Sequence, residues 1–363
     1  MQKKLVFFIS SLSSGGAERV VSVLSKQMLN HFEQVEIVTY FDLPVFYALD
    51  SKVKLECLER KTHSKSVLVN CKYLRKHLNE TRPTVLISFM APFNILALLS
   101  VPWRRDYPVI VADRNDPRYE CRNLMRRVLR YFLYKYKADR VVVQTKNNTR
   151  FYPSRVRRKI EVIYNPISIQ SEKIGCALSV PKQKLLVNVA RLERQKNQKM
   201  LLRSFKGVFE KHPEYRLIIY GEGQMREELL SYSKTLGIED YVFFPGRESD
   251  IIEKIKVATI FVLSSDYEGM SNSMLEAMCI GLPVVSTEVS GAIDLITDNV
   301  NGSLVPIGDE VLMTEAILSI IEDETKRMNL ATNAVKVSSL LDVNNITDKW
   351  VKCISSAAAK IIR

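Results

Sequence analysis

Three observations on the sequence predict an α/β protein built from two doubly wound domains in tandem. Short apolar runs alternate with stretches of helical periodicity along most of the chain, which is typical of βαβ units around a parallel sheet. The pattern breaks at Tyr164-Asn165-Pro166, stays weak as far as Pro181, and then starts again. The chain of 363 residues is long for one domain but sufficient for two, each with its own hydrophobic core.

The first half contains apolar runs of strand length with helical patterns between several of them. Because these runs are short and continuous, they predict buried parallel strands. The strands are expected at residues 5–9, 35–39, 53–57, 85–89, 109–112, 141–144 and 160–163. The helices are expected at residues 17–31, 66–79, 94–100 and 119–137.

The second half repeats the alternation and ends in a helical tail. The strands are expected at residues 185–190, 217–220, 242–244, 260–263 and 283–286. The helices are expected at residues 198–211, 224–236, 251–257 and 272–280. The tail, 344–361, places the apolar side chains Ile346, Trp350, Val351 and Ile354 on one helical face. The predicted domains are residues 1–168 and 169–343. Because ligands bind beyond the carboxyl ends of the strands in such sheets, we expect the two domains to face each other across a cleft.

The composition is that of a soluble globular protein, with 46% apolar and 26% charged residues. The sequence has no run approaching the roughly 20 apolar residues of a membrane span. The first ten residues are too short for a signal peptide and predict a strand. Six cysteines without a CxxC pair indicate reduced thiols in a cytoplasm, and neither disulfides nor a zinc site.

The net charge of +13 is concentrated in the first half of the chain. Residues 1–168 hold 30 Lys and Arg against 14 Asp and Glu, whereas residues 169–363 hold 23 against 26. A basic half indicates a partner such as nucleic acid or an anionic membrane surface. We find no helix-turn-helix, zinc or RNP-like pattern, so the sequence favours the membrane and argues against nucleic acid.

The segment Asp266–Met278 is the most informative part of the chain. Its carboxylates Glu268 and Glu276 lie eight residues apart, around a glycine and the expected start of a helix near Asn272. The free backbone N–H groups of a helix start attract phosphate. The two carboxylates are suited to accept hydrogen bonds from sugar hydroxyls. This combination suits the diphosphate of a nucleotide-sugar.

A simpler interpretation of the same segment needs no ligand. Ser273 and Glu276 could form a helix capping box, in which the serine bonds the N3 amide and the glutamate reaches back. Glu268 could then be a solvated loop residue.

A basic loop follows the first strand of the second half. Arg191 lies at the end of that strand, and Lys196 follows five residues later. Two cations at this position could clamp a diphosphate and neutralise the charge on a leaving group. The alternative is a loop whose basic side chains are merely solvated.

Three glycine-containing turns give weaker signals. Residues 12–19, with Gly15 and Gly16, connect the first strand to the first helix, where backbone can approach an anion closely. That segment is neither a Walker A loop nor a GxGxxG motif. The turns at 220–223 and 244–247 also follow strands, and their glycines could serve only the turn.

Taken in this order, these pieces resemble the retaining family 4 glycosyltransferases. The resemblance is strong over residues 181–305 and supportive over 1–168. In the first half, Gly15-Gly16-Ala17-Glu18-Arg19 and residues 112–117 are similar to bacterial members that build surface polysaccharides such as capsule and O-antigen of lipopolysaccharide. The resemblance implies the GT-B fold, with two Rossmann-like domains. It also implies that the first domain binds the acceptor, that the second binds the nucleotide-sugar, and that the tail helix packs back on the first domain.

The resemblance also implies roles at matching positions. Arg191 and Lys196 would hold the donor diphosphate, and with Glu268 they form the expected catalytic set. Glu268 would accept from hydroxyls of the transferred sugar, and Glu276 from the ribose. Main chain near Arg247 would meet the base. Gly16 would approach the phosphates from the first domain. The residues whose amides are expected to cradle sugar and phosphate are Gly269, Met270, Ser271, Asn272, Met274 and Leu275.

One departure from the family concerns the acceptor side. Many members place a histidine in the first domain near the transferring sugar, but here the matching segment is Asp113-Arg114-Asn115-Asp116. We take Arg114 or Asn115 as its substitute and place Glu18 on the same side. The retaining mechanism implied by the family is a front-face displacement, in which the leaving phosphate itself deprotonates the acceptor. The chain has no DxD pair, so we expect no catalytic metal and no cofactor besides the UDP-sugar substrate.

The segment 118–137 predicts a basic amphipathic helix, because arginines and lysines interleave there with Leu124, Val128, Phe132 and other apolar residues. We expect this helix to lie on the inner face of the cytoplasmic membrane and the acceptor to be a polyprenyl-diphosphate-linked glycan. The alternative is that its apolar residues face the core and its arginines solvate the outside.

The resemblance favours a UDP-linked hexose or N-acetylhexosamine as donor, with galactose or N-acetylgalactosamine ahead of glucose types. Two rival functions remain open at this point: a GT-B sugar-nucleotide epimerase, and a non-catalytic protein that binds nucleotide-sugars.

Overall fold

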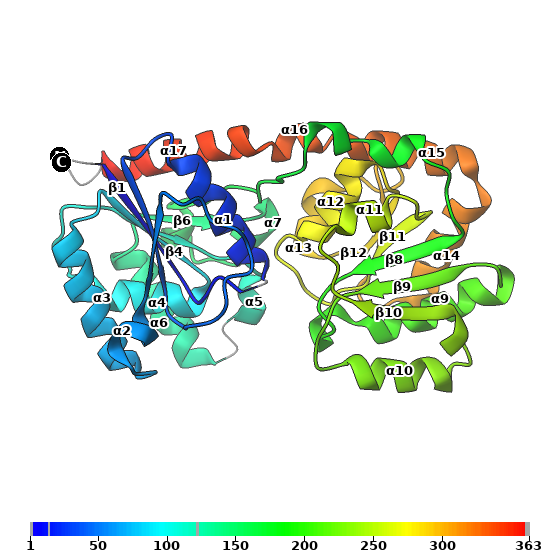
Figure 1. Cartoon of the computed structure of the whole chain (residues 1–363), viewed down its shortest axis with the longest axis horizontal. Coiled ribbons are helices and arrows are strands. Elements are labelled where there is room, and N and C mark those ends of the chain that lie inside the picture. The colour runs from blue at the N-terminus through cyan, green and yellow to red at the C-terminus, as the bar shows by residue number, and fades with distance from the viewer. Residues whose placement is uncertain (1–2, 14, 121–122, 360–363) are drawn as a thin grey trace. The chain divides into compact units, whose positions relative to one another are not determined.

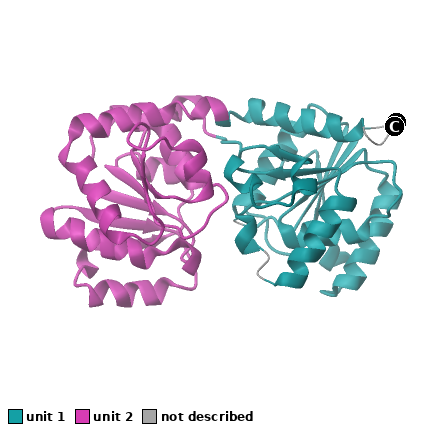
Figure 2. Cartoon of the chain, turned by 180° about the vertical axis from the view of Figure 1, so that it is seen from behind, with its two compact units in different colours: residues 1–168, 341–363 teal, residues 169–340 magenta. Residues whose placement is uncertain are grey.

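The computed structural model describes residues 3–13, 15–120 and 123–359. The chain divides into two compact units, coloured separately in Figure 2. Unit 1 runs to residue 168 and resumes at 341, and unit 2 comprises residues 169–340. Residue 341, where unit 1 resumes, lies three residues before residue 344, at which the tail helix was expected to begin.

Unit 1 is built around one parallel sheet with the order β3-β2-β1-β4-β5-β6-β7. Its strands are β1 (Lys4–Ile9), β2 (Gln34–Thr39), β3 (Val53–Cys57), β4 (Val85–Phe89), β5 (Val109–Ala112), β6 (Arg140–Val143) and β7 (Ile160–Val162). The apolar runs predicted all of these strands to within one residue at each end. The strand order changes direction between β1 and β4, which makes the carboxyl edge there the place where ligands bind in doubly wound sheets.

Helices cover both faces of this sheet (Figure 1). They are α1 (Gly16–Met28), α2 (Leu58–Thr62), α3 (Val67–Thr81), α4 (Ala91–Ser100), α5 (Pro117–Glu120), α6 (Leu124–Tyr136), α7 (Lys146–Thr149), α8 (Ser154–Arg157) and α17 (Val343–Ala358). Helices α1 and α17 share one apolar core with the sheet, and α3, α4 and α6 share the other. In the first core, Trp350 of α17 is fully buried and packs 5.8 Å from the ring of Phe89.

The prediction of one helix over 119–137 was wrong. The segment forms two helices, α5 and α6, with residues 121–122 outside the described part of the chain. A new helix begins at Leu124 because the side chain of Asn123 accepts a hydrogen bond from the Arg126 amide at 3.3 Å. Periodicity alone does not show such a cap, since the polar residue fits an uninterrupted amphipathic pattern equally well.

Unit 2 has a second parallel sheet with the order β10-β9-β8-β11-β12-β13. Its strands are β8 (Leu185–Val189), β9 (Arg216–Tyr220), β10 (Val242–Gly246), β11 (Ile260–Leu263), β12 (Val284–Thr287) and β13 (Ser303–Val305). Its helices are α9 (Gln198–Lys211), α10 (Arg226–Thr235), α11 (Ile251–Ile255), α12 (Asn272–Ile280), α13 (Ser290–Leu295), α14 (Glu310–Glu322), α15 (Glu324–Val335) and α16 (Ser338–Leu341). The sequence interpretation missed β13 and α13–α16. The order of this sheet changes direction between β8 and β11, so the expected ligand edge lies there.

A buried carboxylate joins three elements of unit 1 below the sheet surface. Glu36 on β2 is fully buried, with Lys4 Nζ 2.7 Å and His77 Nε2 3.2 Å from its oxygens. Burial alone would raise the pKa of Glu36, but the hydrogen bonds and charges of His77 and Lys4 outweigh it and lower the pKa from 4.5 to about 2. Since the pKa is depressed, the stability that the carboxylate contributes is present above pH 4.5 and is lost as the pH falls towards 2.

We therefore predict that Glu36→Gln flattens the acid dependence of unit 1 stability. A depression from 4.5 to about 2 corresponds to about 3 kcal/mol lost by the wild type over that interval. Urea unfolding followed by tryptophan fluorescence measures this unit selectively, because both tryptophans, Trp103 and Trp350, belong to unit 1. Identical pH profiles for wild type and variant between pH 2 and 5 would contradict the prediction.

Candidate active site

Two loops meet at the carboxyl edge of the second sheet, one after β8 and one after β11. Ser264 Oγ donates to the Lys196 carbonyl at 2.9 Å, and the Asp266 amide donates to the Gln195 carbonyl at 2.9 Å. Asn197 Nδ2 in turn donates to Asp266 Oδ1 at 2.7 Å. These bonds fix the basic loop against the acidic one.

The side chains of Lys196 and Glu268 form an ion pair at this junction. Both are largely buried, with 13% and 9% of their side-chain surfaces exposed, and Ser265 Oγ donates to the same Glu268 oxygen at 3.0 Å. The alternatives of a solvated basic loop at Lys196 and a solvated carboxylate at Glu268 are therefore wrong. The loops bring one cation and one acceptor together in a sheltered place.

Arg191 lies on the same loop but projects further into solvent. Its side chain is 58% exposed and its Nη1 lies 2.9 Å from Glu193 Oε1. Exposed ion pairs contribute only about 0–1 kcal/mol, so an anionic ligand could take over this guanidinium at little cost. The backbone of Arg191 is held by Gln198 Nε2, which donates to its carbonyl at 2.9 Å.

Helix α12 begins beside these residues. Its cap is Ser271, whose side chain accepts from the Met274 amide at 3.4 Å. Ser273 instead donates to the Val189 carbonyl at 2.7 Å, which ties the helix start to the end of β8. The proposed capping box with Ser273 as its first residue is therefore wrong. Glu276 is buried, with 4% of its surface exposed. The Leu275 amide donates to the Ser271 carbonyl at 3.1 Å, so the amides of Met274 and Leu275 are already engaged, contrary to the prediction that they cradle sugar and phosphate. Because helix starts present unsatisfied amides, the earlier part of the segment, from Gly269 to Ser273, can donate to an anion.

The turn at Gly221 supports the basic loop from behind. Gly221 has a φ of +137°, and a Cβ there would lie 2.0 Å from the Ala190 carbonyl oxygen. The Leu192 amide also donates to the Glu222 carbonyl at 2.9 Å. This turn therefore positions the loop that carries Arg191, as the simpler interpretation of its glycines supposes. Arg247 is exposed just after β10, and its expected approach to the base stays a prediction.

Gly291 is a residue of this site that the sequence interpretation missed. It is the second residue of α13, and a Cβ there would lie 2.5 Å from the Gly269 carbonyl oxygen and 2.8 Å from the Met270 Cα. The backbone of the loop before α12 therefore passes directly over this glycine. The only sequence signal was an isolated glycine after a strand, which is common in loops of every kind.

In unit 1, Gly16 opens α1 and Glu18 lies in its first turn. The Glu18 side chain is buried and folds back over the helix start, since a Cβ on Gly15 would lie 2.0 Å from its Oε2. A carboxylate in this position is stabilised by the helix dipole. The structure places Glu18 beside Gly16 on the first sheet's carboxyl side.

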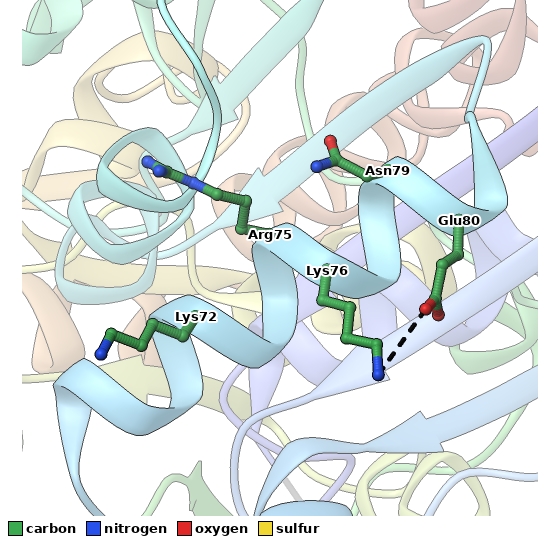
Figure 3. A pocket seen from close by; sticks show the side chains of 5 residues that line it. All are labelled: Lys72, Arg75, Lys76, Asn79 and Glu80. Carbon is green, nitrogen blue, oxygen red and sulfur yellow. Dashed lines mark ion pairs between the residues drawn. The ribbon is translucent and has the colours of Figure 1, made fainter.

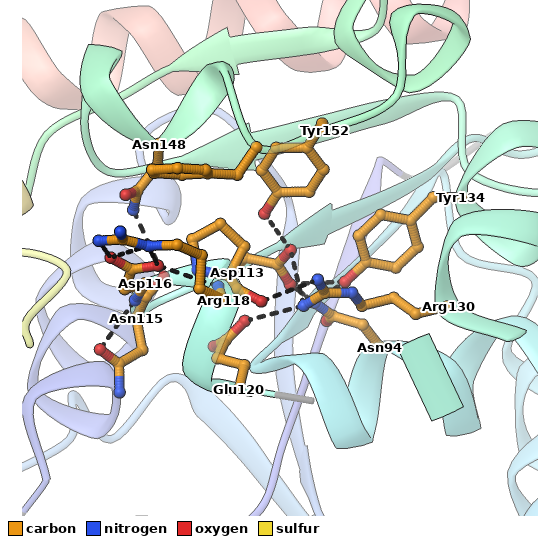
Figure 4. A network of polar contacts seen from close by, with 12 residues as sticks. Asn94, Asp113, Asn115, Asp116, Arg118, Glu120, Arg130, Tyr134, Asn148 and Tyr152 are labelled. Atoms are coloured by element: carbon orange, nitrogen blue, oxygen red, sulfur yellow. Dashed lines mark hydrogen bonds and ion pairs between the residues drawn. The ribbon is translucent and has the colours of Figure 1, made fainter. Parts of the chain in front are cut away.

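A buried polar network lies under the 113–120 segment (Figure 4). Asp113 accepts hydrogen bonds from Tyr134, Tyr152 and Asn94, and Arg130 Nη1 lies 3.3 Å from Glu120 and 3.9 Å from Asp113. Burial, followed by the charge of Asp113, raises the pKa of both tyrosines well above its usual range. The network therefore holds Asp113 as a structural carboxylate at the end of β5.

The two candidate substitutes for a histidine differ in their surroundings. Arg114 is buried, with its Nη2 donating to Asn165 Oδ1 and its Cζ 5.4 Å from the centre of the Phe89 ring. Asn115 is half-buried, and its Oδ1 accepts from the Asp116 amide at 2.8 Å.

Helix α6 has its apolar side chains outside. Met125 is 81% exposed, whereas Arg130 on the opposite side is fully buried. The exposed apolar residues of α6 are Leu124, Met125, Val128, Leu129, Phe132 and Tyr136. The alternative that this helix turns its apolar face to the core is therefore wrong. Within the described residues, no helix is long and apolar enough to cross a membrane.

Another basic surface lies on α3 and is separate from these residues. Figure 3 shows its five side chains around a hollow of about 390 Å³: Lys72, Arg75, Lys76, Asn79 and Glu80. Lys76 pairs with Glu80 at 3.8 Å, and Arg75 Nε donates to the Ser100 carbonyl at 2.7 Å. These contacts indicate a structural role in joining α3 to α4.

Comparisons with known proteins identify the family. A model described as Glycosyltransferase Family 4 matches residues 14–171, and one described as Glycosyl transferases group 1 matches residues 172–337. The chain is a family 4 glycosyltransferase. A Campylobacter jejuni relative named GalNAc-alpha-(1->4)-GalNAc-alpha-(1->3)-diNAcBac-PP-undecaprenol alpha-1,4-N-acetyl-D-galactosaminyltransferase is 29% identical over 97% of this chain and 98% of its own. The amylovoran biosynthesis glycosyltransferase AmsD of Erwinia amylovora is 27% identical over 96% of this chain and 98% of its own.

Solved structures share the fold of both units. The structure of Anabaena HepE in complex with UDP and glucose is 19% identical, with a TM-score of 0.81 over 98% of this chain and 100% of its own. The lipopolysaccharide outer core galactosyltransferase WaaB is 20% identical, with a TM-score of 0.76 over 97% of this chain and 99% of its own. The fold is therefore GT-B, with two Rossmann-like domains. Membership in a family of transferases does not favour the epimerase or the non-catalytic alternative.

We predict that Gly291→Ala raises the KM for the sugar donor by roughly tenfold, because the added methyl group must push the Gly269–Met270 backbone aside. The matched control is Gly207→Ala on α9, whose Cβ would meet only the movable Thr314 side chain at 2.9 Å. Donor titrations and thermal unfolding of both variants measure this. A normal donor KM in the Gly291 variant, or an equal rise in both, would count against the assignment.

Proposed function

We propose that this enzyme is a retaining glycosyltransferase that transfers a hexose or N-acetylhexosamine from a UDP-sugar to a lipid-linked glycan in bacterial surface-polysaccharide synthesis. The observation that carries the proposal is the meeting of Lys196, Glu268 and the start of α12 at one sheet edge. The Campylobacter relative's name specifies an undecaprenol-linked acceptor, and the HepE structures contain UDP. Both support the proposed substrates.

The donor side follows from the charges at that edge. Arg191 and Lys196 would bind the diphosphate of the donor, and the amides at the start of α12 would complete its cradle. Glu276 would accept from the ribose hydroxyls and Glu268 from the transferred sugar. Since Lys196 and Glu268 pair with each other, the diphosphate and the sugar would be held next to the bond that breaks.

The proposed reaction needs few protein groups. The bond between the anomeric carbon and the donor phosphate oxygen breaks, and an acceptor hydroxyl oxygen bonds to that carbon on the same face. The acceptor proton passes to the leaving phosphate, so UDP departs and no protein base is required. Arg191 and Lys196 would stabilise the charge that develops on the diphosphate. Metal independence is part of this proposal.

The proposed sugar is galactose or N-acetylgalactosamine. Two Campylobacter relatives, 29% and 27% identical, are named as N-acetylgalactosaminyltransferases, and a Salmonella typhimurium relative is named lipopolysaccharide 1,6-galactosyltransferase. These names support the choice, which depends on contacts to individual sugar hydroxyls.

We further propose that α6 binds the anionic inner face of the cytoplasmic membrane. Its six exposed apolar side chains recur at spacings that put them on one side of the helix. Arg126 and Arg127 are exposed on the same helix, and unit 1 has the large basic excess. A helix with an outward apolar face and flanking arginines suits the boundary between head groups and acyl chains.

The donor is found by measuring UDP or GDP release from UDP-galactose, UDP-N-acetylgalactosamine, UDP-glucose, UDP-N-acetylglucosamine and GDP-mannose, each with and without a polyprenyl-linked acceptor extract. We expect acceptor-dependent UDP release from one galacto-configured donor. Loss of the ribose contact in Glu276→Gln should lower kcat/KM by roughly tenfold to a hundredfold, because a hydrogen bond to a charged group contributes about 1.5–3 kcal/mol.

The same assay in excess EDTA tests metal independence, with full activity as the expected result. Activity lost in EDTA and restored by manganese would contradict that part of the proposal. Silence across the donor panel, together with no thermal shift on adding UDP, would contradict the function itself.

We predict that anionic vesicles sediment more of the wild type than neutral vesicles do. The double variant Val128→Asp, Phe132→Asp should bind anionic vesicles at least tenfold more weakly, since burying each side chain contributes about 1.5–3 kcal/mol. The control Val311→Asp changes a similarly exposed valine on α14. Equal binding to both vesicle types, or equal loss in variant and control, would argue against α6 as the membrane surface.

A further inference from the structure

Arg114 is a buried cation in unit 1 that has no anionic partner among the described residues. Only 9% of its surface is exposed, and its Nη1 has no hydrogen-bond partner. Its Nη2 donates to the neutral amide oxygen of Asn165 and, at 3.3 Å, to that of Gln144 in the amide orientation that satisfies both groups. Its guanidinium also lies over the ring of Phe89. None of these contacts balances its charge.

The carboxylates of the same segment are engaged elsewhere. Asp113 accepts from Tyr134, Tyr152 and Asn94. Asp116 accepts from Arg118 Nη2 at 2.7 Å. Glu120 lies 3.3 Å from Arg130, and it accepts from the backbone of Arg114 while its charge acts on the guanidinium only through space.

An uncompensated buried guanidinium is expensive for a fold. Removing a charge from water costs several kcal/mol unless a counter-ion or full hydrogen bonding replaces the water. In agreement, burial lowers the pKa of the Arg114 guanidinium from its usual range to about 9. Such costs are tolerated chiefly where the group serves binding or catalysis.

The position of Arg114 is also that of a ligand site. It follows β5, next to the end of β4, where the order of the first sheet changes direction. Met90, the residue after β4, has a φ of +71° and donates its amide to the Ala112 carbonyl at 2.9 Å. Backbone strain of this kind in a residue other than glycine gathers at functional sites.

We propose that Arg114 binds a phosphate oxygen of a diphosphate with its guanidinium, as an anion site in unit 1 distinct from Arg191 and Lys196. A sugar hydroxyl would fill the hydrogen bond but leave the charge unbalanced, whereas a phosphate does both. The diphosphate belongs either to the nucleotide-sugar or to the lipid-linked acceptor. The choice between these two sources rests on the proposed function, whereas the binding of a phosphate by Arg114 does not.

The first test separates a binding role from a structural one. Arg114→Gln keeps a donor for Asn165 but removes the unpaired charge, so unit 1 should unfold at the same urea concentration as the wild type or a higher one. Tryptophan fluorescence follows unit 1 alone, since Trp103 and Trp350 both lie there. Inorganic pyrophosphate should raise the wild-type midpoint but not that of Arg114→Gln, and Arg114→Lys should retain part of the shift.

UDP and geranyl diphosphate identify the source of the phosphate. Each compound is added to the single variant Arg191→Gln and to the double variant Arg191→Gln, Arg114→Gln. The difference between the two shifts in the urea midpoint is the part that depends on Arg114. A shift with UDP assigns the site to the donor, and a shift with geranyl diphosphate alone assigns it to the acceptor. The control Arg104→Gln removes an exposed charge from the same unit. Ligand should raise its urea midpoint by as much as it raises that of the wild type.

Two outcomes would overturn the inference. One is a marked loss of unit 1 stability in Arg114→Gln without ligand, with Arg114→Lys restoring stability but no ligand shift. The other is the absence of any Arg114-dependent shift with all three compounds. If the donor panel is silent but the shift persists, the proposed function fails while the anion site stands.

Discussion

Parallel strand pairing is the constraint on which the remaining structure depends. Every pairing between named strands in both sheets is parallel, so each strand requires a crossover, and all carboxyl ends of a sheet meet at one edge. Because both faces of such a sheet are covered, polar chemistry is confined largely to the loops at its edges. The loops after β8 and β11 carry Arg191, Lys196 and Glu268, and the loops after β4 and β5 carry Met90 and Arg114.

The buried charges of Glu36, of the Lys196–Glu268 pair and of Arg114 differ in how far neighbouring groups balance them. Glu36 has Lys4 and His77 directly on its oxygens, and it lies within β2, away from the loops. Lys196 and Glu268 balance each other one to one, at the edge of the second sheet. Arg114 has only neutral contacts, at the edge of the first. Of these three charges, only that of Arg114 lacks an opposite charge, as expected if a ligand supplies it.

The sequence predicted most of the architecture, because a buried parallel strand leaves a short continuous apolar run. It predicted the start of α12 at Asn272 but not the cap, because Ser271 and Ser273 are equally good cap residues in the sequence. In the structure Ser273 donates to the carbonyl at the end of β8, and Ser271 is the cap. Gly291 could not be predicted, because the need for a glycine there comes from the backbone of Gly269 and Met270, more than twenty positions earlier in the chain. Helices α13–α16 were missed where the alternation with apolar strands ended and a single short strand, β13, remained.

Helix α6 is a second element whose buried side the sequence pattern could not predict. An amphipathic pattern does not say which face is buried, and the usual assumption of an apolar inner face fails here because Arg130 and Tyr134 supply the inner contacts. Those two side chains hold Glu120 and Asp113, and Asp113 directly precedes Arg114. The exposed apolar face and the unpaired guanidinium are therefore fixed to each other through one buried network. In the proposed function, a lipid surface that binds α6 would also set the height of Arg114 above it, and this height would determine which phosphate of a lipid-linked substrate it can reach.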